Sequence, residues 1–131
     1  MNKQELEATL AHFCGSLSWF RHPLTSRFIW SEGVDFLIEE AKCWWLVNDI
    51  FIHLTVGKEI RQQPEHVQMF HFWELIVENN AATLTAYEDL GINPFIEKEY
   101  DYTDFPLDEI KFYAGKDSPE GPYKLFLPSE Y

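Results

Sequence analysis

The spacing of the apolar residues changes along this chain, and the change limits the folds that it can adopt. In "SEGVDFLIEEAKCWW", which begins at Ser31, apolar residues recur three and four positions apart, as in a helix with one buried face. In "VQMFHFWELIV", which begins at Val67, apolar residues follow the two-residue period of a strand. The polar segment 58–66, which contains Pro64, is predicted to connect the two patterns. The chain is therefore predicted to be an α+β protein, with a helix-rich half over 1–57 and a β-rich half over 67–131.

The first half is predicted to contain two helical regions. Asn2 can cap the first helix, and Glu5, three residues later, can reach back to the cap. The second region begins at Ser31 and extends toward Gly57, which is too long for one unbroken helix, so we expect a break near Lys42–Cys43. Between the two regions, "RFIW" is predicted to form a short strand.

The second half is predicted to form a five-stranded antiparallel meander, with the amino-terminal helices packed on one face. Asn79–Asn80 can supply the left-handed backbone of a tight hairpin turn. "FIEKEYDY", residues 95–102, alternates between polar and apolar faces, and two further strands lie within "FPLDEIKFYAG" and "YKLFLPSEY". A chain of 131 residues that is 46% hydrophobic can build one core, so we expect a single domain, 1–131.

The negative charge is concentrated in the second half of the chain. The formal net charge is -12, and residues 65–131 contain 14 acidic and 4 basic residues, against 8 and 6 in residues 1–64. Such a surface repels nucleic acid and anionic membranes and favours a basic protein partner. A solvated acidic surface without any partner has the same composition.

The sequence predicts a cytoplasmic protein without a cofactor or metal. The start, "MNKQELEATL", lacks the apolar run of a signal peptide, and "CWWLVNDIFIHL" is interrupted by polar residues. Cys14 and Cys43 have neither the spacing of a zinc site nor that of a disulfide framework, so both are predicted to be buried thiols. The sequence contains no phosphate loop, nucleophile elbow, paired Cys-x-x-Cys or His-Glu-x-x-His motif.

The clearest candidate binding surface is an acidic strand face. Glu97, Glu99 and Asp101 alternate along one predicted strand, and Asp104 continues the acidic run. Alternate carboxylates on a strand lie about 6.5 to 7 Å apart, close to the phosphate spacing of a nucleic-acid strand. The face can therefore mimic DNA for a basic protein, or its charge can protect an edge strand from aggregation. We favour the protected strand.

A pair of adjacent tryptophans offers a second candidate binding surface. Trp44 and Trp45 point about 100° apart on a helix, so both cannot face one core. An exposed ring here, with Trp45 as the candidate, would anchor an interface. The alternative is that another layer of the fold covers it.

Arg21, His22, Asp49 and His53 are the candidates for a catalytic or ligand-binding site. Arg21 can bind an anion and His22 can act as a base, while Asp49 can orient His53 one helical turn away. The structural interpretation is favoured: Pro23 biases His22 to an extended backbone, and Asp49 and His53 form an ordinary helix surface pair. In this interpretation, the aromatic residues before Arg21 fill space under the end of the first helix.

Several short segments of the sequence, taken in order, resemble those of a known family. These are "SWFRHPL", "SEGVDFLIEEA" followed by "WWLVNDI", "ATLT", "YTDFPLDEIKFY" and "LFLPSEY". They resemble a family of small bacterial proteins of unknown function, sometimes carried on plasmids or other mobile elements. The resemblance implies a cytoplasmic single-domain protein and supplies no activity, substrate or catalytic residue.

Together, these features favour a protein-interaction module without catalysis of its own, binding through the acidic strand face or an exposed aromatic patch. The alternative is a small enzyme or ligand-binding protein with a pocket between helices and sheet. Homo-oligomerisation is compatible with both.

Overall fold

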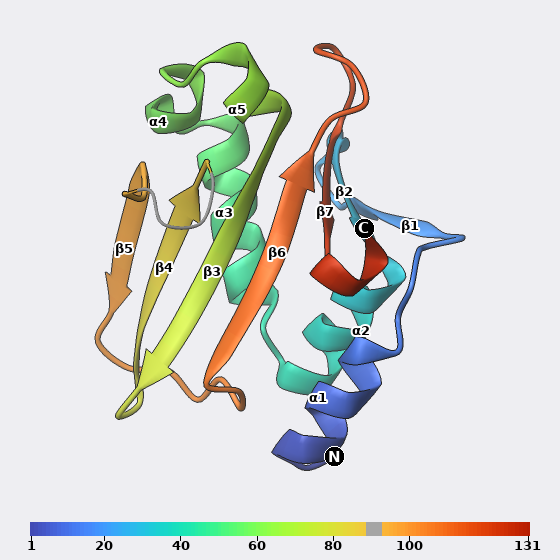
Figure 1. The fold of residues 1–131 in the computed structure, drawn as a ribbon, viewed down its shortest axis with the longest axis vertical. Helices are drawn as coiled ribbons and strands as arrows, with labels where there is room; N and C mark the ends of the chain where they lie inside the picture. Colours follow the sequence, from blue (N-terminus) through green and yellow to red (C-terminus); the bar gives the residue numbers. More distant parts are fainter. Residues whose placement is uncertain (89–92) are drawn as a thin grey trace.

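A computed structural model describes residues 1–88 and 93–131 of the chain (Figure 1). Over these residues, seven strands form one sheet in the order β1-β2-β7-β6-β3-β4-β5. The strands are β1 (Trp19–His22), β2 (Thr25–Ser31), β3 (Phe70–Glu78), β4 (Ala81–Tyr87), β5 (Ile96–Tyr100), β6 (Glu109–Gly115) and β7 (Tyr123–Phe126). The α+β class is confirmed, while the predicted number of five strands is wrong.

The strand order also differs from a meander. After β5 the chain returns to the other side of β3, where β6 pairs antiparallel, and β7 then pairs with β6. The predicted strand "RFIW" lies in β2, which runs parallel to β7. The preceding "WFRH" forms β1, where Trp19 and Phe20 are 38% and 39% exposed rather than packed under a helix. Alternation identifies a strand, but the neighbour of that strand depends on contacts between distant segments.

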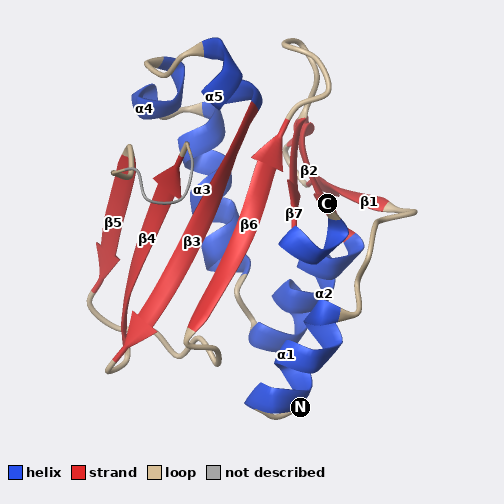
Figure 2. Cartoon of the chain, in the orientation of Figure 1, coloured by secondary structure: helices blue, strands red, loops and turns tan. Residues whose placement is uncertain are grey.

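The helices lie behind the sheet and at its ends (Figures 1 and 2). They are α1 (Lys3–Ala11), α2 (Glu32–Ala41), α3 (Trp44–Thr55), α4 (Lys58–Arg61), α5 (Glu65–Met69) and the short 3-10 helix η1 (Pro128–Glu130). α3 crosses behind the strands, whereas α4 and α5 lie at the upper end of the sheet, so the helices extend beyond a layer on one face. The predicted connection 58–66 holds α4 and the start of α5, which is why β3 begins at Phe70 rather than Val67.

Local capping chemistry sets the helix ends. Asn2 Oδ1 accepts a hydrogen bond from the Glu5 backbone N–H at 2.8 Å, and Ser31 Oγ accepts one from the Val34 N–H at 3.2 Å. Lys42 has a φ of 53° and ends α2, which confirms the predicted break. None of the helices that the structure describes is both long and apolar enough to span a bilayer.

The core lies between the back face of the sheet and α2 and α3. On β3, His71, Trp73 and Leu75 are buried, as the two-residue period of this segment predicts, whereas the preceding Val67 and Met69 lie in α5. One buried cluster draws side chains from both halves of the sequence, including Leu37 and Phe112. Cys43 belongs to this cluster, but Cys14 is exposed, so the prediction of two buried thiols is wrong for Cys14.

Candidate interaction surface on the open sheet face

The front face of the sheet carries a continuous row of aromatic side chains. No described helix lies in front of β3, β4 or β6, as Figures 1 and 2 show. Strand pairing places Phe72 of β3 between Tyr87 of β4 and Tyr113 of β6, and it places Tyr113 beside Phe126 of β7. Successive ring centroids along this row are 5.5, 6.3 and 5.7 Å apart. Trp19 extends it, with its ring 6.5 Å from that of Phe126.

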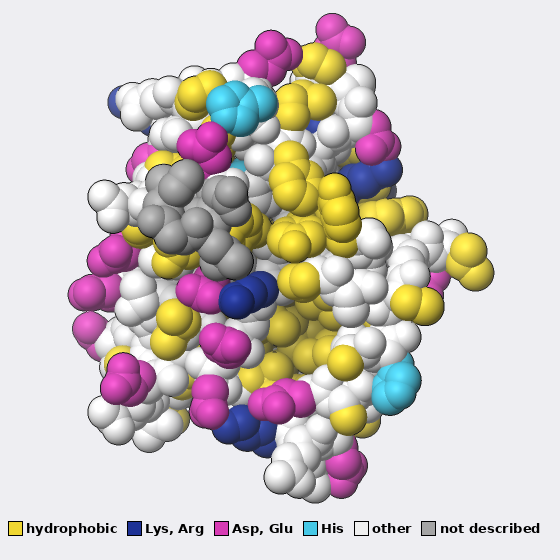
Figure 3. Space-filling view, in the orientation of Figure 1, with side chains coloured by type: hydrophobic (Ala, Val, Ile, Leu, Met, Phe, Trp, Pro, Cys, Tyr) yellow, Lys and Arg dark blue, Asp and Glu magenta, His cyan; other side chains and the backbone are white. Residues whose placement is uncertain are grey.

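Two further rings lie against this row and are more exposed. The Phe70 and Tyr131 centroids are 5.6 Å apart, and Tyr131 lies 5.3 Å from Tyr113. Phe70 is 39% exposed and Tyr131 is 83% exposed. We call these seven rings the aromatic row: Trp19, Phe70, Phe72, Tyr87, Tyr113, Phe126 and Tyr131. Figure 3 shows hydrophobic side chains gathered over β3 and β6 on this face.

The carboxyl-terminal residues are held in place by Glu130. Its Oε1 accepts hydrogen bonds from the Ser31 hydroxyl at 2.6 Å and from the Leu127 N–H at 2.9 Å, and its Oε2 accepts one from the Gly33 N–H at 3.1 Å. A Cβ at Gly33 would lie 2.7 Å from Glu130 Oε1, so only glycine leaves room for the carboxylate. The segment "LPSEY" thus has a structural role, because the hydrogen bonds of Glu130 hold the adjacent Tyr131 beside the other rings.

Acidic side chains share this face with the aromatic row. Glu97 and Glu99 of β5 pair with Thr85 and Thr83 of β4, which face the front with Phe72 and Tyr87. Two lysines of this face already form ion pairs within the chain. Lys111 Nζ lies 3.6 Å from Glu74 Oε2, and Lys124 pairs with Asp117. The β5 side of the face therefore remains negative, as Figure 3 shows along that edge.

The other two acidic candidates lie beyond the strand. β5 ends at Tyr100, so Asp101 is outside it and the predicted strand 95–102 is too long at its carboxyl end. The Thr103 N–H donates to the Asn80 carbonyl at 2.7 Å, which ties the segment after β5 to the β3–β4 turn. Asp101 and Asp104 are both exposed.

His22 is buried among carbon atoms and hydrogen-bonded at both ring nitrogens. Its ring stacks on Phe51 with centroids 3.8 Å apart. Nδ1 accepts from the Leu24 N–H at 3.1 Å, which leaves the proton on Nε2 to donate to Asn48 Oδ1 at 3.1 Å. The side chain is 2% exposed, so it fixes the β1–β2 turn against α3.

The other three catalytic candidates have separate surroundings. Asp49 accepts hydrogen bonds from Lys98 Nζ at 2.7 Å and from the Tyr100 hydroxyl, which tie α3 to β5. His53 packs against Trp73, with centroids 5.8 Å apart. Arg21 is exposed on β1. Among the described residues no polar contact joins any two of the four candidates, so the structure does not assemble them into one site.

Comparison with known proteins identifies the family. The profile of a family of unknown function, DUF6876, matches residues 4–131. The chain belongs to this family. The whole-chain resemblance inferred from the sequence is thereby confirmed. No curated protein and no solved structure matches the chain. Membership of DUF6876 assigns no activity, so the geometry of the surface carries the functional inference.

The tryptophan pair of this DUF6876 protein lies away from the aromatic row. Trp45 packs against Tyr100 with ring centroids 5.2 Å apart, and Tyr100 faces the opposite side of β5 from Glu97 and Glu99. Trp45 is half-buried, whereas Trp44 is 36% exposed and packs on His22.

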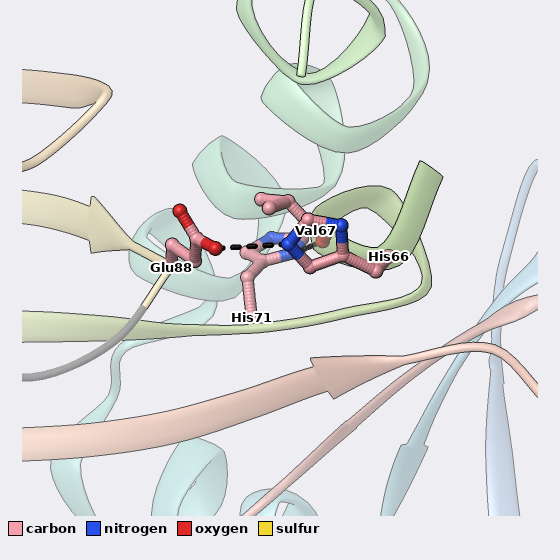
Figure 4. A network of polar contacts seen from close by, with 4 residues as sticks. All are labelled: His66, Val67, His71 and Glu88. Atoms are coloured by element: carbon pink, nitrogen blue, oxygen red, sulfur yellow. Dashed lines mark hydrogen bonds and ion pairs between the residues drawn. The ribbon is translucent and has the colours of Figure 1, made fainter. Parts of the chain in front are cut away.

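Figure 4 shows His66, which lies in α5, and His71, which lies in β3, together with Glu88, which directly follows β4. His66 Nε2 lies 2.9 Å from Glu88 Oε1 at the surface, which joins α5 to β4. His71 is fully buried, and its Nδ1 lies 2.9 Å from the Val67 carbonyl oxygen. Within the described ranges, no three His, Cys, Asp or Glu side chains lie close enough to hold a metal ion.

The aromatic row was not predicted from the sequence, although "MFHFWE" contains part of its signal. In "MFHFWE" His71 and Trp73 alternate with Phe70 and Phe72, so aromatic residues occupy both faces of β3, with Phe70 39% exposed and Phe72 buried among the described residues. A strand with one solvated face carries polar residues there, and phenylalanines in their place indicate a surface that binds. The contributions of Trp19 and Tyr131 depend on the fold.

Proposed function

We propose that this protein is a non-catalytic interaction module that binds a basic protein through the open face of its sheet. The observation that carries the proposal is the aromatic row, seven neighbouring rings of which Trp19, Phe70 and Tyr131 are exposed and Phe72 is buried, on a face where no described helix lies in front of β3, β4 or β6. A contiguous apolar patch on a folded chain is typical of a binding surface, and aromatic rings supply much contact area at low entropic cost.

The charge of the same face favours a basic partner. Glu97 and Glu99 flank the aromatic row, while Lys111 and Lys124 are each paired with a carboxylate. A second copy of the chain would bring a net charge of -12 against another -12 and place equivalent acidic residues on both sides of a symmetric interface. A basic partner instead gains attraction at long range and apolar contact at the centre.

The test uses affinity purification from cells that encode the protein, at low and high salt. The baits are wild type, Phe70→Ser and Tyr131→Ser, with Ile52→Ser as the matched control, because Ile52 is 44% exposed on α3 and lies outside the aromatic row. We expect one basic protein to be retained by wild type and by the control, and to be lost from the other two baits and at high salt. Equal retention by all four baits would overturn the proposal.

Sedimentation of the purified chain tests the competing occupant. We expect a monomer for wild type at micromolar concentration. A wild-type dimer that Phe70→Ser converts to a monomer would show that a second copy of the chain covers the aromatic row. The proposal of a basic partner at this surface would then be wrong.

A further inference from the structure

A pocket of about 430 Å³ lies away from the aromatic row, where residues of α3, α4 and β2 meet the segment between β6 and β7. In Figure 1, α4 and the segment between β6 and β7 both lie in the upper part of the molecule. The apolar part of its lining consists of Phe51, Leu54, Ile60 and Tyr123. Its basic part consists of Arg27, Arg61 and Lys116.

The charge of this pocket is opposite to that of the whole protein. The chain has 10 Lys and Arg against 22 Asp and Glu, yet Arg27, Arg61 and Lys116 line the pocket and no described lining residue is acidic. Across residues 1–88 and 93–131, the ion pairs engage other basic residues, and none includes these three. Three cations have thus gathered without a carboxylate in a chain rich in carboxylates.

Neutral contacts position two of these cations without cancelling their charge. Arg61 donates from Nη2 to the Val56 carbonyl at 3.0 Å and from Nε to the Gly57 carbonyl at 3.3 Å. Lys116 Nζ lies 4.4 Å from the centre of the Tyr123 ring. These contacts hold the cationic groups at the pocket before any ligand arrives, which reduces the entropic cost of binding one.

The surroundings of Lys116 make its charged state less favourable than it is in water. Burial lowers the pKa of its ammonium group, and the positive charge of Arg27 lowers that pKa further. A neighbouring carboxylate would have the reverse effect on the pKa. An anion placed between Lys116 and Arg27 would relieve the repulsion and supply the missing opposite charge.

The floor of the pocket offers carbon to the rest of the ligand. Leu54, Ile60 and Tyr123 are buried beneath the pocket, and Phe51 is half-buried. The Tyr123 hydroxyl donates to the Gln68 carbonyl at 2.9 Å, which fixes the orientation of its ring. A ligand here can contact both cations and apolar surface, the usual composition of a small-molecule site.

We propose that this pocket binds a small organic anion, in which a carboxylate or phosphate group contacts Arg27, Arg61 and Lys116 and an apolar body packs on Phe51 and Ile60. This site is separate from the aromatic row, so it stands or falls independently of the interaction described above.

The test measures binding of four probes by calorimetry at constant ionic strength: phenyl phosphate, benzoate, inorganic phosphate and phenol. We expect saturable binding of phenyl phosphate or benzoate, with the tighter of the two identifying the oxyanion. Inorganic phosphate should bind more weakly because it lacks the apolar body, and phenol should not bind because it lacks the charge. If none of the four probes binds when each is present at millimolar concentration, the proposal is overturned.

Variants locate the binding in this pocket. Arg27→Gln and Lys116→Gln should each weaken the binding of the tighter probe by roughly tenfold or more, as expected for a lost charge-assisted hydrogen bond. Lys58→Gln is the matched control, because Lys58 is an exposed cation of α4 outside the pocket lining. This variant should bind the probe as tightly as wild type does. Equal affinity of all three variants would show that the probe binds elsewhere and would overturn the assignment.

The unliganded variants provide a check on folding. Because Arg27 lacks a carboxylate partner among the described residues, neutralising it should leave the melting temperature at or above that of wild type. A clear loss of stability in unliganded Arg27→Gln would indicate that the guanidinium stabilises the fold. It would contradict the proposal that Arg27 serves to bind an anion.

Discussion

His71 illustrates how the fold commits a titratable residue to a structural role. Nε2 accepts a hydrogen bond from Trp73 Nε1–H at 3.0 Å, so the ring proton is on Nδ1 and is donated to the Val67 carbonyl. Protonation of Nε2 would place two donors against each other in a site without water contact. Burial lowers the pKa of His71 to about 4.

The lowered pKa of His71 predicts a pH dependence of stability. Between pH values of about 6.5 and 4, the unfolded chain binds a proton at this residue that the native chain does not, so native stability falls as the pH decreases through this window. The loss can reach about 3 kcal/mol. Urea unfolding across this window should show a steeper decrease for wild type than for His71→Gln.

A matched control separates this effect from the titration of the carboxylates. His12 is exposed at the end of α1, so His12→Gln should retain the wild-type pH dependence. Equal slopes for wild type and His71→Gln would show that His71 titrates normally in the native state.

At the scale of elements, features that act over a few residues could be predicted from the sequence, and distant pairings could not. The Asn2 cap and the break at Lys42 depend on neighbouring residues only. The parallel pairing of Phe28 in β2 with Tyr123 in β7 joins opposite ends of the chain, and no period in either segment indicates it. The same limit applied to His22, whose partner Asn48 lies 26 positions later.

The β3–β4 turn provides a test of local backbone chemistry. Asn79 and Asn80 have φ values of 54° and 63°, as the two central residues of a tight hairpin require. Asn80→Val should destabilise the protein by about 1 to 2 kcal/mol, because a branched side chain is strained in this conformation. Asn80→Gly should stay close to wild type. Similar stabilities of the two variants in urea would show that the turn relaxes to another geometry.

The Glu130 anchor connects the end of the chain to the aromatic row. Glu130→Ala would leave the buried Ser31 hydroxyl and the Gly33 N–H without their acceptor, at a cost of about 2 kcal/mol. It should also release Tyr131, which NMR would detect as a loss of the ring-current shifts that Tyr113 and Phe126 impose. Glu120→Ala, at an exposed turn, is the control. Unchanged Tyr131 shifts would show that stacking alone holds the ring.

In the whole molecule, the open face combines the acidic strand face that the sequence offered with a row of aromatic rings that it did not. Glu97 and Glu99 were predictable as an exposed alternating row, and the structure places them on the same face as the aromatic row. The row itself could not be predicted, because its rings come from positions as distant as Trp19 and Tyr131. Only the order of strands in the sheet aligns them.

The double variant Glu97→Gln/Glu99→Gln distinguishes a binding role of these acids from protection of the β5 edge. If they attract a basic partner, association should slow and become less sensitive to salt, because long-range attraction acts on the rate of encounter. If they only protect the edge strand, association should be unchanged and light scattering should reveal aggregation through the uncharged strand. We expect the slower association, because Glu97 and Glu99 face the side of the sheet that carries the aromatic row. Stopped-flow kinetics at two salt concentrations measures it, and an unchanged rate would leave the aromatic row alone as the source of affinity.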